Sequence, residues 1–237
     1  MRLSAGPIPV EAIRKWKLEA TARLLGDTIG ISDPQWGEPS LLPGWSRGHV
    51  ATHLARNADT MRQLTAAAHQ RGPDVGYPSA QERSDSIEAG AGRTGLELQI
   101  DLDTSAGALK ATWDKVTDWG IQVNLYGRAW PLSILPLIRL HEVILHHIDL
   151  DCGFAADDVD PSAARWLLDW ALTRLETATR LPRVAISSDS GVVGAIGAGV
   201  RELAVSGADA RLWAWLCGRA VGDTVQGANG AVLPLLS

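Results

Sequence analysis

The chain has 237 residues, of which 46% are hydrophobic and 21% are charged, and 22 basic against 27 acidic side chains give a formal net charge of −5. This composition is typical of a globular protein and excludes wholesale disorder. With no basic patch, the chain is not expected to bind nucleic acid. No apolar run approaches the roughly 20 residues of a membrane-spanning helix, and the start of the chain lacks the apolar core of a secretory signal. Since no seam for a dimer is evident either, we expect a cytoplasmic monomer.

The first two thirds of the chain have the apolar spacing of amphipathic helices. Ser46 is an expected N-cap for the second of them, and Pro136 limits where the fourth can begin. The expected helices cover residues 10–25, 47–69, 98–118 and 134–150. Four helices with long connections predict a helical bundle, which we assign to residues 1–157.

The character of the chain changes after the acidic, proline-containing stretch 157–161, which could be a linker or a helix start. Helices are expected over residues 162–178 and 210–219, and short strands over 183–188 and 202–206. The glycine-rich run 194–199 lacks the order of a phosphate-binding loop and is expected to be a turn. Residues 158–237 therefore form a predicted small α/β domain, and the fold class is α+β.

Histidines gather in the predicted bundle, where all six fall between positions 49 and 147. Glu142 and His146 are four residues apart, which places them on one face of a helix. Either His49 or His53, from another helix, could complete a two-histidine, one-carboxylate set that leaves metal positions open. The alternative is a plain Glu–His surface hydrogen bond. Because Glu142 lies among apolar residues, it needs a partner, either a metal or an arginine.

The remaining candidates lie near the ends of the predicted elements. Cys152 and Cys217 form neither a disulfide framework nor a CxxC site and are expected to be inert core thiols. Arg219 follows Cys217 and Gly218, and taken alone it is more compatible with a solvated arginine at a helix end than with a functional one.

Two motifs carry a resemblance to a known family. Residues 41–57, LLPGWSRGHVATHLARN, resemble the N-terminal motif of mycothiol-dependent maleylpyruvate isomerases, and residues 139–150, RLHEVILHHIDL, resemble that family's second motif. The resemblance implies a DinB-like four-helix bundle followed by a small domain similar to sterol carrier proteins. It implies zinc held by His53, Glu142 and His146, with His49 outside the ligand set. The additional His141 and His147 beside the second motif leave another choice of ligands open.

The resemblance also implies a reaction. In this family a zinc-bound thiol of mycothiol adds to maleylpyruvate, a bond rotates, and elimination gives fumarylpyruvate, a step of gentisate-type aromatic degradation. Arg219 matches a functional arginine of the family's C-terminal domain, where it could clamp a carboxylate of the small anionic substrate. One alternative is a mycothiol S-transferase of the same fold, which conjugates the thiol to an electrophile in detoxification or secondary metabolism. Another is a non-catalytic metal-binding bundle.

Overall fold

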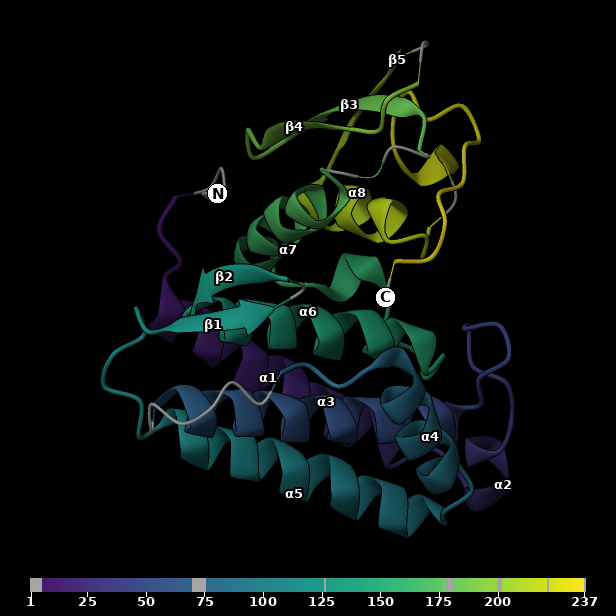
Figure 1. The fold of residues 1–237 in the computed structure, drawn as a ribbon. Helices are drawn as coiled ribbons and strands as arrows, with labels where there is room; N and C mark the ends of the chain where they lie inside the picture. Colours follow the sequence, from purple (N-terminus) through teal and green to yellow (C-terminus); the bar gives the residue numbers. More distant parts are fainter. Residues whose placement is uncertain are drawn as a thin grey trace. The chain divides into compact units, whose positions relative to one another are not determined.

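The structure, a computed structural model, describes residues 6–69, 76–125, 127–176, 178, 181–199, 202–220 and 222–236. It combines helices with small sheets, which confirms the mixed character of the α+β prediction (Figure 1). The chain divides into two compact units, one of Lys17–Phe154 and one of Met1–Trp16 with Ala155–Ser237. The predicted domains, residues 1–157 and 158–237, stay predictions.

The unit Lys17–Phe154 is mainly helical. Its long helices are α1 (Val10–Thr28), which begins in the other unit, α3 (Arg47–His69), α5 (Gly95–Trp113) and α6 (Ile134–Asp149). All four predicted helices are confirmed: α3 has the predicted ends, and each of the other three differs at one end or both. The hydroxyl of Ser46 accepts a hydrogen bond from the amide of His49 at 3.3 Å, as expected of an N-cap. Pro136 lies in the first turn of α6, where a missing amide proton costs nothing.

Helix α5 begins and ends earlier than the predicted range 98–118. Thr94 and Glu97 form a capping box, in which each side chain accepts a hydrogen bond from the other residue's backbone amide. This box starts the helix at Gly95. At the other end the chain leaves the helix after Trp113, whose indole nitrogen donates to the hydroxyl of Thr65 at 3.0 Å and fixes α5 against α3.

Four short elements of this unit were not expected from the sequence. Helices α2 (Asp33–Trp36) and α4 (Ala80–Ala91) are short, and strands β1 (Gln122–Leu125) and β2 (Arg128–Pro131) form an antiparallel pair. Helix α4 buries only Ile87 and Ala91, so its apolar periodicity is weak. The missed signal is its capping box, in which Ser79 accepts from the amide of Glu82.

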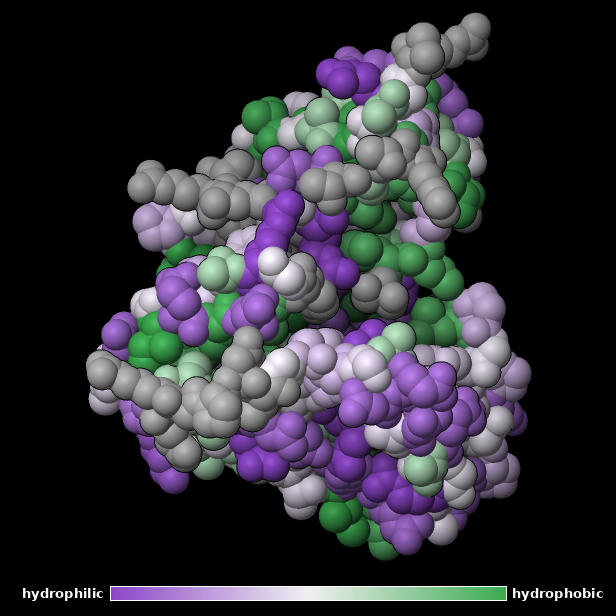
Figure 2. Space-filling model, in the orientation of Figure 1, coloured by the Kyte–Doolittle hydropathy of each residue, from purple (hydrophilic) through white to green (hydrophobic). Residues whose placement is uncertain are grey.

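The core of this unit lies where α1, α3, α5 and α6 meet. One cluster joins Leu24 of α1, Val50 and Leu54 of α3, Leu98 of α5 and Val143 of α6. Outside the core, hydrophilic side chains cover much of the visible face of α5 (Figure 2).

Two glycines let α3 and α4 approach closely. A Cβ placed at Gly48 of α3 would overlap the carbonyl oxygen of Ala91, at the end of α4. One placed at Gly90 would lie 2.6 Å from the Thr52 methyl group. Backbone therefore packs on backbone where α4 ends.

The other unit contains a three-stranded sheet and two longer helices. Its strands are ordered β4 (Val193–Ile196), β3 (Arg183–Ser188) and β5 (Glu202–Gly207), with β3 antiparallel to β4 and parallel to β5. The elements α7 (Pro161–Leu175), α8 (Asp209–Leu216), η1 (Ala156–Asp158) and η2 (Gly222–Thr224) complete it.

Two sequence interpretations of this unit are settled by its local structure. Asp160 accepts hydrogen bonds from the amides of Ser162 and Ala163, so the acidic stretch is a helix start. The run 194–199, expected to be a turn, supplies three of the four residues of β4, in which Ile196 is buried and Gly194 lies so close to Leu172 that a Cβ would be 2.8 Å from its side chain. Within the described ranges, no helix is long and apolar enough to cross a membrane.

Candidate metal centre

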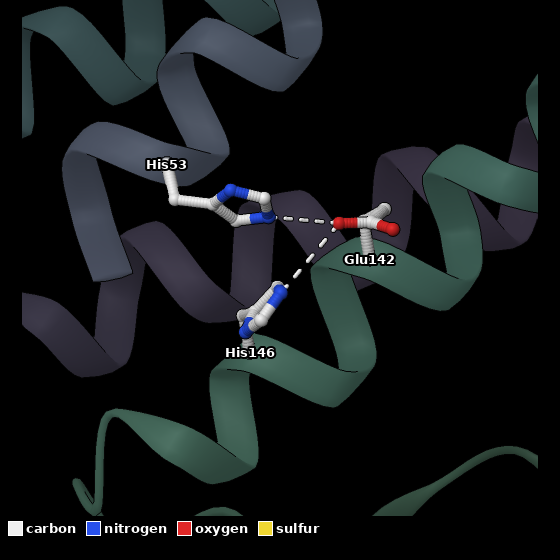
Figure 3. Close-up of side chains that lie close together, drawn as sticks. All are labelled: His53, Glu142 and His146. Carbon is white, nitrogen blue, oxygen red and sulfur yellow. Dashed lines mark hydrogen bonds and ion pairs between the residues drawn. The ribbon is translucent and has the colours of Figure 1, made fainter. Parts of the chain in front are cut away.

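Helices α3 and α6 bring three ligand-type side chains together (Figure 3). His53 lies in the second turn of α3, and Glu142 and His146 lie one turn apart on α6. Nε2 of His53 is 2.9 Å from Oε2 of Glu142, and Nε2 of His146 is 3.5 Å from the same oxygen. The three side chains face one another between the two helices, although His53 and Glu142 are 89 residues apart in the sequence.

The spacing of these atoms suits one divalent ion. Each residue offers a ligand atom within 4.8 Å of the others. In a tetrahedral zinc site with bonds of about 2.0–2.2 Å, neighbouring ligand atoms lie roughly 3.3–3.6 Å apart. Small side-chain movements therefore bring the trio to that geometry. Two nitrogens and a carboxylate oxygen are a donor set that zinc accepts, and three protein ligands leave a fourth position open.

Protonation of the trio depends on burial and on mutual contacts. Burial, followed by the charge of His146, lowers the pKa of His53 despite its hydrogen bond to Glu142. Burial opposes ionisation of Glu142, yet hydrogen bonds from His146 and His53 hold its pKa well below the usual range. For His146 the penalty of burial is outweighed by hydrogen bonds to Asp149 and Glu142, which raise its pKa. An ionised carboxylate between two imidazoles is thus the stable state of the cluster.

Asp149 fixes the orientation of His146. Its Oδ2 lies 2.8 Å from Nδ1 of His146, and the two side chains are only 1% and 3% exposed. Because a carboxylate can only accept, Nδ1 carries the proton, and this leaves Nε2 to face Glu142. Such an outer carboxylate is typical of metal-binding histidines. Asp149 was not among the site residues predicted from the sequence, although its spacing of three residues from His146 on one helix was the available signal.

A buried arginine lies beside the trio. Arg139 on α6 donates through Nη1 to the carbonyl of Leu54 at 2.7 Å and to the amide oxygen of Asn57 at 2.8 Å. Burial lowers its pKa to about 10, so the guanidinium stays charged near neutral pH. Its charge is one of the influences that lower the pKa of His53.

The other histidines named in the sequence analysis lie outside this cluster. Nδ1 of His49 is 2.7 Å from the hydroxyl of Ser46, and its Nε2 is 3.4 Å from Oε2 of Glu88. His147 stacks on Phe154 and pairs with Asp27 at 3.2 Å. In the part of the chain that the structure describes, neither these residues nor His141 joins a group of metal-ligand type.

Arg219 and Cys217 belong to the unit that holds the sheet. The Arg219 guanidinium donates to the backbone carbonyls of Cys217 and Leu236, and Cys217 is fully buried. Cys152 lies in the helical unit, where burial, followed by the charge of Asp27, raises the pKa of its thiol. Neither cysteine belongs to the metal-ligand trio.

A mainly helical unit with a two-histidine, one-carboxylate cluster defines a candidate metalloprotein. The model of the mycothiol maleylpyruvate isomerase N-terminal domain matches residues 18–151. This match covers more than half of the chain, which therefore belongs to the mycothiol maleylpyruvate isomerase family, as its two motifs predicted. No curated protein matches the sequence.

Solved structures show the same fold over the whole chain. A crystal structure of a mycothiol-dependent maleylpyruvate isomerase matches with a TM-score of 0.85, and one of a histidine-to-alanine mutant of such an enzyme matches with 0.86. Each is 23% identical in sequence, and each comparison covers 98% of both chains.

Proposed function

We propose that this protein is a zinc- and mycothiol-dependent cis–trans isomerase that converts maleylpyruvate to fumarylpyruvate. The convergence of His53, Glu142 and His146, in a chain of this family, is the observation that carries the proposal. We further propose that the helical unit is the family's DinB-like bundle and that residues 158–237 form a domain similar to sterol carrier proteins.

In this proposal His53, Glu142 and His146 are the zinc ligands. A divalent ion in that position supplies a Lewis acid that lowers the pKa of a thiol bound to it. The lowered pKa of His53 keeps its imidazole uncharged near neutral pH, and Asp149 holds His146 with Nε2 toward the ligand position. Glu142 contributes the negative charge that favours a cation between the helices.

The nucleophilic thiol comes from outside the chain in this proposal. Neither Cys152 nor Cys217 belongs to the trio, and the raised pKa of Cys152 disfavours its thiolate.

Arg219 has the planar, bidentate donor geometry that a carboxylate of an anionic substrate requires. Its Nη1 donates to the backbone carbonyls of Cys217 and Leu236, and these bonds orient the guanidinium.

The test is an ultraviolet assay of maleylpyruvate conversion by zinc-loaded protein with mycothiol, glutathione or no added thiol. We expect conversion with mycothiol only. Failure with every thiol, in protein that holds one zinc per chain, would favour S-transfer and call for a screen of electrophiles. A zinc content far below one per chain, in protein purified without added zinc, would favour a non-catalytic bundle.

A further inference from the structure

Two arginines join α3 to α6, one on each side of the metal-ligand trio. Arg139 of α6 donates to the backbone carbonyl of Leu54 in α3 at 2.7 Å. Arg47 of α3 donates to the carbonyl of Leu150, the C-cap of α6, also at 2.7 Å. The two helices therefore run in opposite directions, and along both of them the trio lies between the two arginine contacts.

Arg139 contacts the turn of α3 that carries His53. Its Nη1 donates to the carbonyl of Leu54, the residue after His53, and to the side-chain oxygen of Asn57 at 2.8 Å. Leu54 and Asn57 are three residues apart, so both acceptors belong to one helical turn. Since both must stay within bonding distance of one nitrogen, α3 cannot rotate about its axis without breaking a bond.

The two ligands on α6 share a helix face with Arg139. Positions 139, 142 and 146 follow the i, i+3, i+7 spacing of one helical stripe. Arg139 therefore connects the face that holds Glu142 and His146 to the turn that holds His53. The contact also joins the two sequence motifs, because Asn57 ends the stretch 41–57 and Arg139 begins the stretch 139–150.

A cavity of about 420 Å³ opens beside the same turn of α3. Its walls come from residues 53–63 of α3 and residues 77–87, which include the first two turns of α4. His53 and Asn57 line this cavity, whereas Arg139 is buried and does not. The arginine thus holds a ligand-bearing wall of the cavity without facing the cavity itself.

The burial of Arg139 argues against a role in stability alone. The residue is 2% exposed, and its Nε has no hydrogen-bond partner among the residues that the structure describes. The carboxylates of Glu142 and Asp59 stabilise its charge only through space. An apolar side chain could fill the same position without the desolvation penalty of a buried cation. What the arginine adds is its pair of directed bonds to α3.

We propose that Arg139 is a positioning residue, which fixes the rotation of α3 against α6 and so holds His53 in place opposite Glu142 and His146. It acts through Leu54 and Asn57 and does not touch the metal position. The proposal rests on the proposed function for the presence of zinc at the trio.

The sign of the effect on zinc affinity separates positioning from electrostatics. A cation beside the trio opposes the binding of a divalent ion. Removal of Arg139 would therefore strengthen zinc binding if its charge were all that mattered. Removal of a positioning residue weakens zinc binding, because the metal must then bring the ligands together itself. A purely structural role would lower stability and leave the zinc affinity of the folded protein unchanged.

The main variant is Arg139→Met/Asn57→Leu. It removes the donor and its side-chain acceptor together, so neither is left buried without the other. Arg139→Lys is the conservative variant, because one ammonium nitrogen keeps the charge and can donate to both acceptors, as Nη1 does. Asn57→Ala is a milder variant, which removes one acceptor and keeps the arginine.

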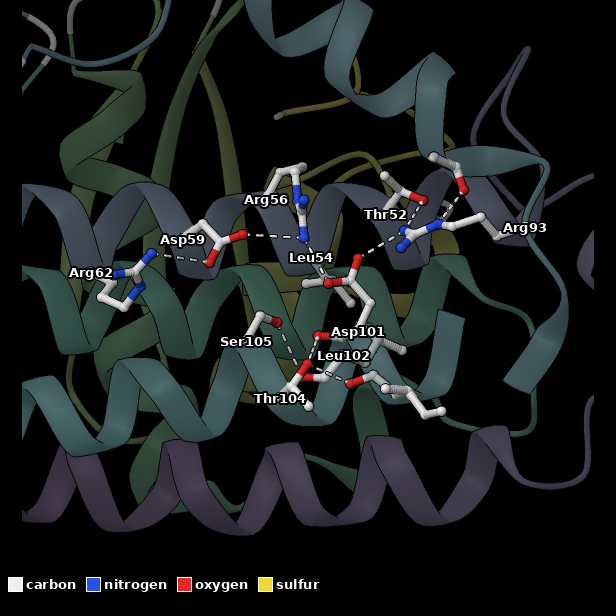
Figure 4. Close-up of polar contacts among 12 residues, drawn as sticks. Thr52, Leu54, Arg56, Asp59, Arg62, Arg93, Asp101, Leu102, Thr104 and Ser105 are labelled. Carbon is white, nitrogen blue, oxygen red and sulfur yellow. Dashed lines mark hydrogen bonds and ion pairs between the residues drawn. The ribbon is translucent and has the colours of Figure 1, made fainter. Parts of the chain in front are cut away.

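Arg93→Met/Thr52→Val is the matched control. Arg93, in the turn between α4 and α5, donates to the hydroxyl of Thr52 in α3 at 3.3 Å and pairs with Asp101 at 2.8 Å (Figure 4). Thr52 directly precedes His53, so the control removes an arginine contact from the same part of α3 but leaves α6 untouched. Asp101 keeps its second partner, Arg56, at 2.7 Å.

Zinc affinity is measured by competition with a chromophoric chelator at fixed pH. The absorption spectrum of the Co²⁺-substituted protein reports the geometry at the metal, and the thermal transition of the metal-free protein reports stability separately. We expect Arg139→Met/Asn57→Leu to bind zinc about tenfold more weakly than the wild type and to change the Co²⁺ spectrum, because bonds from a charged donor are among the stronger ones. Asn57→Ala should lose about threefold.

Arg139→Lys and the control should bind zinc within about twofold of the wild type. Unchanged or tighter zinc binding by Arg139→Met/Asn57→Leu would overturn the inference even if its thermal transition falls, and so would an unchanged affinity in Asn57→Ala. A loss in Arg139→Lys or in the control as large as in Arg139→Met/Asn57→Leu would also overturn it, since the effect would then not follow these bonds. Wild-type protein that takes up no zinc would instead overturn the proposed function.

Discussion

The contact between Asp149 and His146 allows a quantitative prediction for metal binding. Asp149→Asn keeps the shape of the side chain but removes its charge from a 2.8 Å hydrogen bond between two buried groups. Hydrogen bonds to charged groups contribute about 1.5–3 kcal/mol and neutral ones about 0.5–1.5 kcal/mol. The variant should therefore lose roughly 1–1.5 kcal/mol of zinc binding free energy, which is about a tenfold weaker affinity.

The assay is competition for zinc between the protein and a chromophoric chelator at fixed pH. Asp27→Asn is the matched control, because Asp27 pairs with the neighbouring His147 at 3.2 Å and His147 lies outside the ligand trio. We expect the control to bind zinc within twofold of the wild type. If Asp149→Asn also binds zinc within twofold while its circular dichroism is unchanged, Asp149 does not support the ligand and the reasoning is wrong.

Three further predictions concern the ligand set, the arginine and the source of the thiol. His53→Ala should lose zinc and isomerase activity together, measured by metal analysis and the ultraviolet assay; retention of one zinc per chain would reject the ligand assignment. Arg219→Ala should keep zinc but lose at least tenfold in turnover, and unchanged kinetics would remove Arg219 from the site. Cys152→Ser and Cys217→Ser should keep mycothiol-dependent activity, whereas a folded, zinc-loaded but inactive variant would contradict an external thiol.

Metal binding should also release a proton. The pKa of His146 is raised above 6.5 in the metal-free protein, so its proton stabilises that form fully below pH 6.5, and this contribution is lost as the pH rises through the raised value. Zinc binds Nε2 of His146 only when that nitrogen carries no proton. Zinc affinity should therefore fall on acidification, starting above pH 6.5. Calorimetry in buffers of different ionisation enthalpy measures the released proton, and identical heats in all buffers would argue against it.

The long helices could be predicted from the sequence because apolar residues recur along them at helical spacing, although α6 is buried on nearly every side and not along one stripe. Helix α4 could not, since it buries only Ile87 and Ala91 and packs through small residues. The pair β1 and β2 is four residues long on each side, too short for a periodic signal. The mixed fold was therefore predictable, while the wall that completes the cavity beside His53 was not.

The candidate site was predictable to the level of spacing. Four-residue separation placed Glu142 with His146, but it applies equally to His49 and His53, so spacing could not choose between them. The structure separates the two by what each ring contacts. His49 is engaged by the cap of α3 and by Glu88, whereas His53 points to Glu142. The choice depends on how α3 is rotated against α6, which no local pattern specifies.

The close packing of Gly48 against Ala91 has a consequence for how specificity can change. Helix α4 rests on α3 by its C-terminal end, while its first two turns form a wall of the cavity. A methyl group at position 48 would push the C-terminal end of α4 away from α3 and change the angle at which the two helices pack. A substitution at position 48, which does not line the cavity between α3 and α4, could thus widen or narrow that cavity. Divergence in the size of accepted molecules can therefore arise from a hidden helix contact while every lining side chain stays the same.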